Sequence, residues 1–315
     1  MKVFISGGAG FIGSHVAQHL LNSNTVSSIV LFDNLTSGNL SLIKKPLQDP
    51  RVHLCEGDIK HLGMLTHAMQ GADIVFHFAA NPDIAKAVKQ PDIDFWEGTY
   101  LTQNILEAMR INHVSQIVYS SGSGVYGETA TCDFNELFAP CEPVSTYGAS
   151  KLACEALIAS YCHLFNMKGL VFRFANVVGP GQTHGVGFDF IRSLIKDPTL
   201  LPILGDGTQC KSYIHVNDVV AAIQQALTQT KKRYDVYNVA TLDSITVTEI
   251  ASMACEVMEL SNVKYQYTGG DRGWKGDVPK VTLESAKIRA LGWRSQYTSK
   301  QAMVAALQAM KMSAS

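Results

Sequence analysis

Two side chains with complementary chemistry stand four residues apart near the middle of the chain. Tyr147 and Lys151 belong to the stretch TYGASK (146–151), and apolar residues at helical spacing follow over 152–164. A spacing of four places both side chains on one face of a helix. The unperturbed pKa of a phenol is near 10, and we expect the lysine ammonium to lower it by about 1–3 units. Tyr147 is thus a candidate base for an alcohol that loses hydride; an exposed Tyr and Lys on a helix is the alternative.

A hydride carrier is predicted from the start of the chain. GGAGFIGS (7–14) follows the apolar run Val3-Phe4-Ile5 and precedes residues with helical apolar spacing. Strand, glycine turn and helix in this order are typical of a site for a dinucleotide pyrophosphate. Asp33 ends a second strand twenty residues after Gly13, where a carboxylate can bind both adenosine-ribose hydroxyls and select NAD over NADP. The residues expected to contact NAD are Gly7, Gly10, Phe11, Ile12, Asp33, Asn34, Ser37, Gly38, Asp58, Ile59, Phe78, Ala79, Ala80, Tyr147 and Lys151.

The elements that position these residues alternate along the chain. Predicted strands are separated by helical patterns, among them a long one over 93–112, which indicates a parallel sheet covered on both faces. We therefore predict an α/β fold, with a Rossmann doubly wound parallel sheet and a smaller α/β C-terminal substrate domain. The predicted NAD-binding domain comprises residues 1–176 and 211–241, and the substrate domain comprises 177–210 and 242–315. His77 stands within an apolar strand, and we interpret it as structural.

Composition limits the possible partners. The chain has 315 residues, is 46% apolar and carries a formal net charge of −1. Without a basic excess we expect no nucleic-acid partner, and no apolar run is long enough to predict a membrane span. Seven cysteines without a C-x-x-C pair are typical of reduced thiols, so we expect a cytoplasmic protein. Because strand residues begin almost at Met1, we expect no signal peptide.

Taken together, the motifs resemble the extended short-chain dehydrogenase/reductase family, and within it the NAD-dependent epimerases and dehydratases. The resemblance covers nearly the whole chain, and the pattern is most similar to that of members that are UDP-glucose 4-epimerases. The matching stretches are GGAGFIGS (7–14), GDI (57–59), FHFAA (76–80), SSGSGVYGE (120–128), STYGASK (145–151), RFANVVGPG (173–181), GDGTQCKSYIHVND (205–218) and RGWKGDVP (272–279).

The resemblance implies a mechanism and a substrate site. Bound NAD⁺ would take hydride from C4 of a UDP-sugar, the 4-keto sugar would turn over, and hydride would return to its opposite face. The resemblance also implies a homodimer through the helices near 93–112 and 148–165, whose apolar stripes could equally be ordinary core. The implied substrate-binding residues are Asn176, Lys211 and Arg272 for the phosphates, Asp277 for ribose, and Val186 and Phe188 of the 182–191 loop for uracil.

Two positions depart from the family pattern. Gly122 stands where the catalytic Ser or Thr is usual, so Ser121 or Ser123 is expected to supply that hydroxyl, with Ser123 favoured because strand alternation turns Ser121 away. Gly98 stands where Asn is frequent. A non-catalytic NAD-binding protein therefore stays open as an alternative.

Other reactions on the same scaffold are alternatives as well. A UDP-glucuronate epimerase, a 4-keto reductase or a dehydratase would share these motifs. Dehydration is disfavoured because dehydratases of this family carry Thr-Asp-Glu where this chain has Gly122-Ser123-Gly124. Val281 stands where members restricted to plain hexoses tend to carry Tyr, which suggests space for a 2-acetamido group.

Overall fold

The computed structural model describes residues 1–128 and 133–314, and its contacts divide the chain into two compact units. The first unit comprises 1–125, 146–173 and 223–237. The second comprises 126–145, 174–222 and 238–315. These units are defined by packing, so the boundaries given above for NAD and substrate binding stay a prediction.

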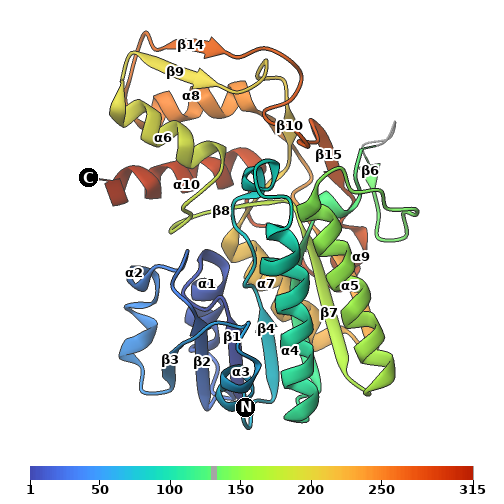
Figure 1. The fold of residues 1–315 in the computed structure, drawn as a ribbon. Coiled ribbons are helices and arrows are strands. Elements are labelled where there is room, and N and C mark those ends of the chain that lie inside the picture. Colours follow the sequence, from blue (N-terminus) through green and yellow to red (C-terminus); the bar gives the residue numbers. More distant parts are fainter. Residues whose placement is uncertain (129–132, 315) are drawn as a thin grey trace. The chain divides into compact units, whose positions relative to one another are not determined.

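A seven-stranded parallel sheet lies at the centre of the first unit (Figure 1), which confirms the predicted doubly wound α/β fold. The strand order is β12-β7-β5-β4-β1-β2-β3. The strands are β1 (Lys2–Ser6), β2 (Ser28–Asp33), β3 (Val52–Glu56), β4 (Ile74–His77), β5 (Gln116–Gly122), β7 (Lys168–Phe174) and β12 (Tyr234–Val239).

The register of this sheet brings the predicted motifs to one edge. β1 pairs in parallel with β2 and β4, so that Ser6 lies opposite Phe32 and His77. β4 in turn pairs with β5, and His77 lies opposite Tyr119. Strand order reverses between β1 and β4, and in open α/β sheets ligands bind beyond the carboxyl ends of the strands at such a switch point. The segments that follow Ser6, Phe32, His77 and Tyr119 share this edge.

Helices cover both faces of the sheet, with α3, α4 and α5 packed in series on one face and α1 and α7 on the other (Figure 1). Apolar side chains of α3, α4 and α5, such as Leu65, Leu106 and Ile158, are fully buried in one core with the sheet. The helices are α1 (Phe11–Leu20), α2 (Leu40–Ile43), α3 (Leu62–Ala68), α4 (Tyr100–Ile111), α5 (Thr146–Leu164) and α7 (Val216–Gln229), with short 3₁₀ turns at Pro46–Gln48, Ile84–Val88 and Ser123–Val125.

The long helix predicted over 93–112 is present as helical residues from 93 to 111, with a change of helix type inside it. A π-helical turn at Phe95–Thr99 precedes α4. Gly98 lies inside this turn, and a Cβ on it would come within 2.4 Å of the Ser150 hydroxyl. The absence of a side chain at Gly98 thus admits α5 close to the turn, a contact that apolar periodicity does not encode.

The second unit packs α6 (Val186–Lys196), α8 (Val247–Val257) and α10 (Ser299–Ala314) around a second apolar core. α8 begins with a capping box, in which Thr246 and Glu249 satisfy each other's backbone N–H groups. In the described part of this unit, four strands form one small sheet in the order β13 (Ile245–Thr246), β10 (Cys210–Lys211), β15 (Lys280–Leu283) and β6 (Asp133–Phe134). Two further sheets have two strands each: β11 (Tyr213–His215) pairs with β8 (Asn176–Val178), and β14 (Lys264–Tyr267) pairs with β9 (Leu200–Ile203). The short helix α9 (Ala286–Ala290) also belongs to this unit.

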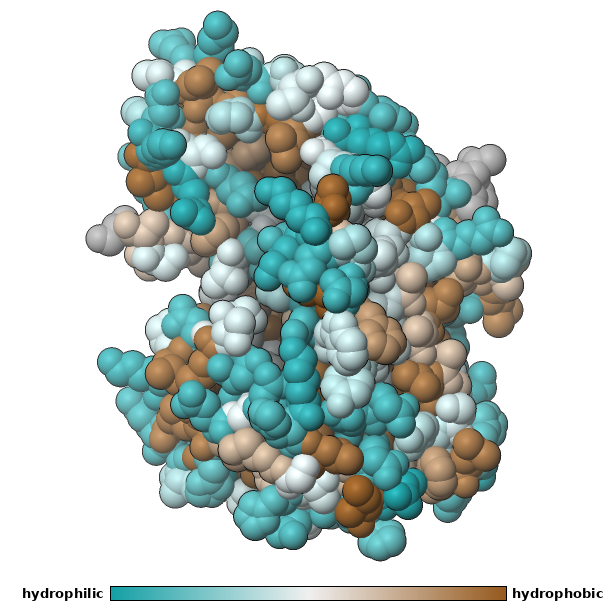
Figure 2. Space-filling model, in the orientation of Figure 1, coloured by the Kyte–Doolittle hydropathy of each residue, from teal (hydrophilic) through white to brown (hydrophobic). Residues whose placement is uncertain are grey.

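The surface view in Figure 2 shows hydrophobic residues dispersed among hydrophilic ones on the face presented. Within 1–128 and 133–314, no helix combines the length and the apolar character that crossing a membrane requires.

Candidate active site

The glycine turn after β1 lies against the segment that follows β4. A Cβ on Gly7 would come within 2.7 Å of the Ala79 nitrogen, and one on Gly13 within 2.2 Å of the Gly7 carbonyl oxygen. Gly7 also has a φ of +68°, a conformation that favours glycine. The turn therefore packs so closely against neighbouring backbone that Gly7 and Gly13 admit no side chain. It lies directly before the N-terminus of α1, as a pyrophosphate site requires.

The predicted adenosine residues follow β2 and β3. The Asp33 carboxylate is buried and accepts N–H bonds of 2.9 Å from Ala9 and from Leu35, one on each oxygen. Each oxygen of an ionised carboxylate accepts two hydrogen bonds, so capacity for ribose hydroxyls is left. Asp58 accepts an N–H bond from Lys60, and Ile59 is buried beside it. These residues fit NAD at this edge of the sheet.

Tyr147 and Lys151 lie in the first turns of α5, as the four-residue spacing predicts. Lys151 is buried, and its Nζ donates a 2.8 Å hydrogen bond to the Ser120 carbonyl oxygen at the end of β5. The same Nζ lies 5.5 Å from the centre of the Tyr147 ring and 4.9 Å from that of Tyr119. The Lys151 ammonium therefore contacts both the end of β5 and the ring of Tyr147.

The sequence predicts a lowered pKa for Tyr147. In the protein without a bound cofactor this prediction is wrong. Burial of the phenol, followed by the negative charge of Asp94, raises the pKa of Tyr147 to about 12. Burial also lowers the pKa of Lys151 to about 8. Attraction between phenolate and ammonium would lower the pKa of Tyr147, but removal from water disfavours both charged forms and has the larger effect here.

Polar groups in the segment before α4 accept hydrogen bonds from the first turns of α5. Asp94 is 1% exposed, and its carboxylate accepts hydrogen bonds from Thr146 Oγ1 at 2.7 Å and from Asn81 Nδ2 at 2.8 Å. The Asp94 carbonyl oxygen accepts a 2.7 Å bond from Ser150 Oγ, which also lies 2.9 Å from Thr99 Oγ1. Tyr147 and Lys151 each directly follow a residue of this network. Asp94 was not among the predicted site residues, because nothing in its local sequence distinguishes it from the exposed carboxylates of the chain.

The two candidate serines occupy different surroundings. Ser121 is buried, and its hydroxyl donates a 2.5 Å bond to Glu155, which also forms a buried ion pair with Arg173. Ser123 is half-buried and begins the 3₁₀ turn after β5. The hydroxyl of Ser121 is thus engaged with the core side of α5, as strand alternation suggested, while Ser123 and Gly122 lie at the strand end.

His77 lies in the sheet as a structural residue. It is fully buried, with Nδ1 2.6 Å from Ser6 Oγ and Nε2 3.0 Å from Thr102 Oγ1. Burial, followed by the positive charge of Lys151, lowers the pKa of His77 to about 3. The imidazole of His77 therefore stays neutral, opposite Ser6, which directly precedes the glycine turn.

The substrate residues implied by the resemblance lie in the second unit. Lys211 forms a 2.5 Å ion pair with Asp277. Arg272 donates from Nη2 to both oxygens of Glu128, at 2.8 and 2.7 Å, and from Nη1 to the Asp277 carbonyl oxygen at 2.6 Å. Asn176 is exposed at the start of β8. Lys211, Arg272 and Asp277 therefore belong to one cluster of charged residues, and Glu128 is a fourth member. Glu128 was not predicted as a site residue, because the sequence gives no sign of its contact with Arg272.

The prediction of a loop over 182–191 is wrong from Val186 onward, because α6 begins at that residue. Val186, Phe190 and Leu194 recur at helical spacing, a signal that the sequence analysis did not use. Val186 and Phe188 are partly buried and pack against the core of the second unit. Their contact with uracil stays a prediction.

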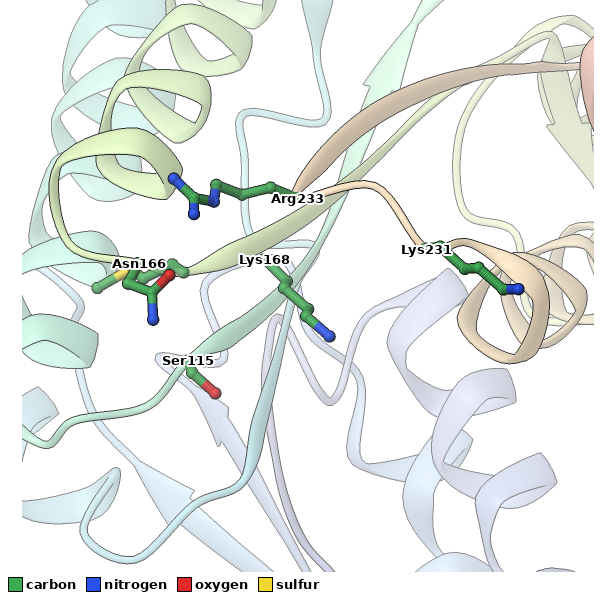
Figure 3. Close-up of a pocket in the computed structure, with 6 residues that line it drawn as sticks. Ser115, Asn166, Lys168, Lys231 and Arg233 are labelled. Carbon is green, nitrogen blue, oxygen red and sulfur yellow. The ribbon is translucent and has the colours of Figure 1, made fainter.

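A hollow of about 430 Å³ lies at the opposite edge of the sheet, beside the amino ends of β5, β7 and β12 (Figure 3). Lys168, Lys231 and Arg233 line it together with Ser115 and Asn166. The side chains of Lys231 and Arg233 point away from each other in Figure 3, so they do not converge on one ligand. The candidate chemistry lies at the carboxyl edge.

The fold and the carboxyl-edge residues define an enzyme that works with a nicotinamide dinucleotide. Residues 3–240 match the NAD dependent epimerase/dehydratase family, and the chain belongs to that family. NAD is its cofactor, as in family members whose structures were solved with NAD bound.

Relatives of known name cover the whole chain. A crystal structure of a UDP-galactose 4-epimerase is 34% identical, covers 99% of both chains and has a TM-score of 0.89. A UDP-glucose 4-epimerase of Lactobacillus helveticus is 27% identical over 94% of this chain and 93% of its own. The UDP-glucuronic acid 4-epimerase of Bacillus cereus, solved with UDP-glucuronic acid and NAD, is 26% identical, covers 99% of both chains and has a TM-score of 0.87. Nucleotide-sugar dehydratases also match, so the family shows an epimerase or dehydratase and leaves the reaction open.

Proposed function

We propose that this enzyme is a 4-epimerase of a UDP-sugar, acting on UDP-glucose/UDP-galactose or UDP-GlcNAc/UDP-GalNAc through a 4-keto intermediate. The observation that carries the proposal is the Tyr147–Lys151 pair of α5, whose lysine contacts the end of β5. Residues 122–124 at that strand end are glycine and serine, without an acid. A 4-epimerase needs one group that removes and returns the proton of a sugar hydroxyl. The pair supplies such a group without a second acid.

The roles of the side chains follow from their chemistry. NAD⁺, when bound, accepts a hydride and later returns it. Tyr147 takes the proton of the sugar O4 and gives it back, Lys151 stabilises the phenolate, and Ser123 hydrogen-bonds the same oxygen. The pKa of about 12 for Tyr147 arises from the protein alone, and the positive charge of an oxidised nicotinamide lowers it, because a nearby cation favours the phenolate.

The nucleotide is anchored while the sugar turns. We assign Lys211 and Arg272 to the diphosphate, Asn176 to the sugar end of that diphosphate, Asp277 to ribose, and Val186 and Phe188 to uracil. Arg272 can offer a planar fork of N–H donors to phosphate oxygens, whereas Lys211 offers a single charge. Lys211 and Arg272 already share a cluster with Asp277, which supports their assignment to one ligand.

A dehydratase is the competing reaction, because dehydratases also belong to the family. Elimination of a hydroxyl needs an acid that protonates the leaving oxygen. Within the strand end 120–124 the side chains are serine or absent, and Ser121 is bonded to Glu155. Epimerisation is therefore the better-supported reaction. Reduction of a 4-keto sugar, epimerisation of UDP-glucuronate and a non-catalytic role are the remaining outcomes of the test below.

The proposal also concerns the substituent at C2 of the sugar. Val281 lies in β15, is 9% exposed and stands in register with Lys211 of β10. A valine at this position supports acceptance of a 2-acetamido group. Turnover of UDP-GlcNAc comparable to that of UDP-glucose is expected, and activity restricted to the plain hexose would contradict this part alone.

The test of the reaction is product analysis by NMR after incubation with UDP-glucose, UDP-galactose, UDP-GlcNAc and UDP-glucuronate. We expect interconversion of a C4 pair, with the same equilibrium mixture reached from either member. A 4-keto-6-deoxy product would establish a dehydratase, consumption of added NADH with a 4-keto sugar would establish a reductase, and unchanged sugars throughout would favour the non-catalytic alternative.

We also propose a cytoplasmic homodimer that joins through α4 and α5. The C-terminal ends of these helices expose Ile111 and Leu164, and Phe165 directly after α5 is exposed as well. The six described cysteines are in no disulfide, which agrees with a reducing compartment. A molar mass of one chain in light-scattering measurements would contradict the dimer.

A further inference from the structure

The guanidinium of Arg272 has both terminal nitrogens engaged within the second unit. Nη2 contacts both oxygens of Glu128, and Nη1 donates to the Asp277 carbonyl oxygen. A bidentate contact with a phosphate uses two parallel N–H bonds of the guanidinium. Both parallel donor pairs of a guanidinium include one terminal nitrogen that is here Nη2, so Arg272 cannot offer a bidentate fork to a diphosphate unless the Glu128 carboxylate leaves.

The charges of the cluster lead to the same conclusion. Two cations, Lys211 and Arg272, lie among three carboxylates, because Asp277 pairs with Lys211 while Glu128 and Asp271 flank Arg272. The cluster therefore has one negative charge in excess. The diphosphate of a UDP-sugar adds about two negative charges at neutral pH, and like charges at close range repel. Departure of one carboxylate removes that conflict.

We propose that the carboxylate of Glu128 competes with the diphosphate of the substrate for Arg272, so that Glu128 determines how tightly the nucleotide binds. This inference rests on the proposed function, since it takes the nucleotide to be a UDP-sugar. The side chains of Arg272 and Glu128 are 36% and 39% exposed. Water screens such pairs, so we expect the loss of the Arg272–Glu128 pair to weaken nucleotide binding by a factor of about two to five.

Gln209 supplies a second observation in the same cluster. It is 3% exposed, and within the described residues neither atom of its amide group has a hydrogen-bond partner. A Cβ on Gly205 would come within 2.0 Å of Gln209 Nε2 and 2.9 Å of the Arg272 carbonyl oxygen, so the amide lies beside the backbone of Arg272. A buried amide without partners is unfavourable. A ligand group that hydrogen-bonds this amide would remove that penalty beside Arg272.

The test measures binding of UDP by isothermal titration calorimetry to the wild type, Glu128→Gln and Asp271→Asn, at low ionic strength where charge effects are largest. Asp271→Asn is the matched control, because it removes a carboxylate beside the same arginine, 3.9 Å from Nε, without breaking the short contact. We expect Glu128→Gln to lower the Kd about two- to fivefold, and Asp271→Asn to change it less than twofold. A Glu128→Ala variant should tighten binding to a similar extent.

Equal Kd values for the wild type and Glu128→Gln would overturn the inference and leave the proposed function standing. Equal tightening by Glu128→Gln and Asp271→Asn would overturn it as well, because the effect would then be one of general charge. Absence of UDP binding in all three proteins, with NAD binding intact, would overturn the proposed function and this inference together.

Discussion

The carboxylate of Asp94 accepts a 2.7 Å hydrogen bond from the hydroxyl of Thr146, the residue directly before Tyr147. The bond ties the segment before α4, in which Asp94 is buried, to the first turn of α5. The Asp94 carboxylate is at the same time a negative charge that raises the pKa of Tyr147. Asp94 is therefore a positioning residue with an electrostatic effect on the proposed base.

Replacement of Asp94 by Asn should alter the pH profile as well as the rate. The amide cannot accept from both Asn81 and Thr146 as the carboxylate does, so we expect kcat to fall about tenfold. Removal of the negative charge lowers the pKa of Tyr147, so the acid limb of the kcat profile should move to lower pH. Thr146→Val is the matched control, because it removes the hydrogen bond but keeps the charge. An identical pH profile in Asp94→Asn and the wild type would show that Asp94 has no electrostatic role.

Replacement of Tyr147 by Phe should remove the proposed base and keep the fold. General acid–base catalysis contributes about 10²–10⁴-fold, so we expect kcat to fall by at least that range. NAD binding, followed by calorimetry, should change little, because the glycine turn and Asp33 are untouched. Turnover equal to that of the wild type would remove Tyr147 from the mechanism.

The two serines of the β5 end should separate function from stability. Ser123→Ala should lower kcat about 10- to 100-fold with the thermal midpoint unchanged, since its hydroxyl is assigned to the substrate. Ser121→Ala should instead destabilise the fold by about 1–3 kcal/mol, because a buried bond to Glu155 is lost. Rate assays and denaturant unfolding distinguish the two effects. The reversed pattern, with Ser121→Ala inactive and fully stable, would transfer the catalytic role to Ser121.

His77 should make the protein sensitive to acid. Its pKa is about 3 in the fold and 6.5 in the unfolded chain, so between these values only the unfolded chain binds the proton. The free energy of unfolding should therefore fall as the pH is lowered from about 6.5 to 3, by roughly 5 kcal/mol in total from this residue. A His77→Gln variant should be less stable at neutral pH and lose that part of the acid dependence. Parallel pH–stability curves for the two proteins would show that His77 does not contribute.

Much of the fold and part of the site could be predicted from local patterns. The glycine turn, Asp33 at a strand end and the four-residue spacing of Tyr147 and Lys151 depend on backbone geometry and on residues close in sequence, and the structure has them on the predicted elements. The capping box of Thr246 and Glu249 is local in the same sense. The start of α6 at Val186 was missed although its helical spacing is also local, so that error belongs to the interpretation and not to the information in the sequence.

Partners from distant segments could not be predicted. Nothing near Asp94 in the sequence indicates Thr146, and nothing near Glu128 indicates Arg272, yet each pair shares a short hydrogen bond. The Ser150 hydroxyl packs where a Cβ on Gly98 would come within 2.4 Å, a contact between two segments far apart in the sequence that no local pattern indicates. Such contacts depend on which face of one element meets another.

The amino-acid sequence by itself determined the α/β fold, the NAD motif and the Tyr147–Lys151 pair, because short-range spacing specifies backbone shape and helical faces. Only the tertiary structure decided the direction in which the pKa of Tyr147 shifts, the engagement of Ser121 with Glu155, and the pairing of Arg272 with Glu128. The physical reason is that burial and Coulomb interactions depend on distances in space, and these are set by the packing of segments far apart in the chain.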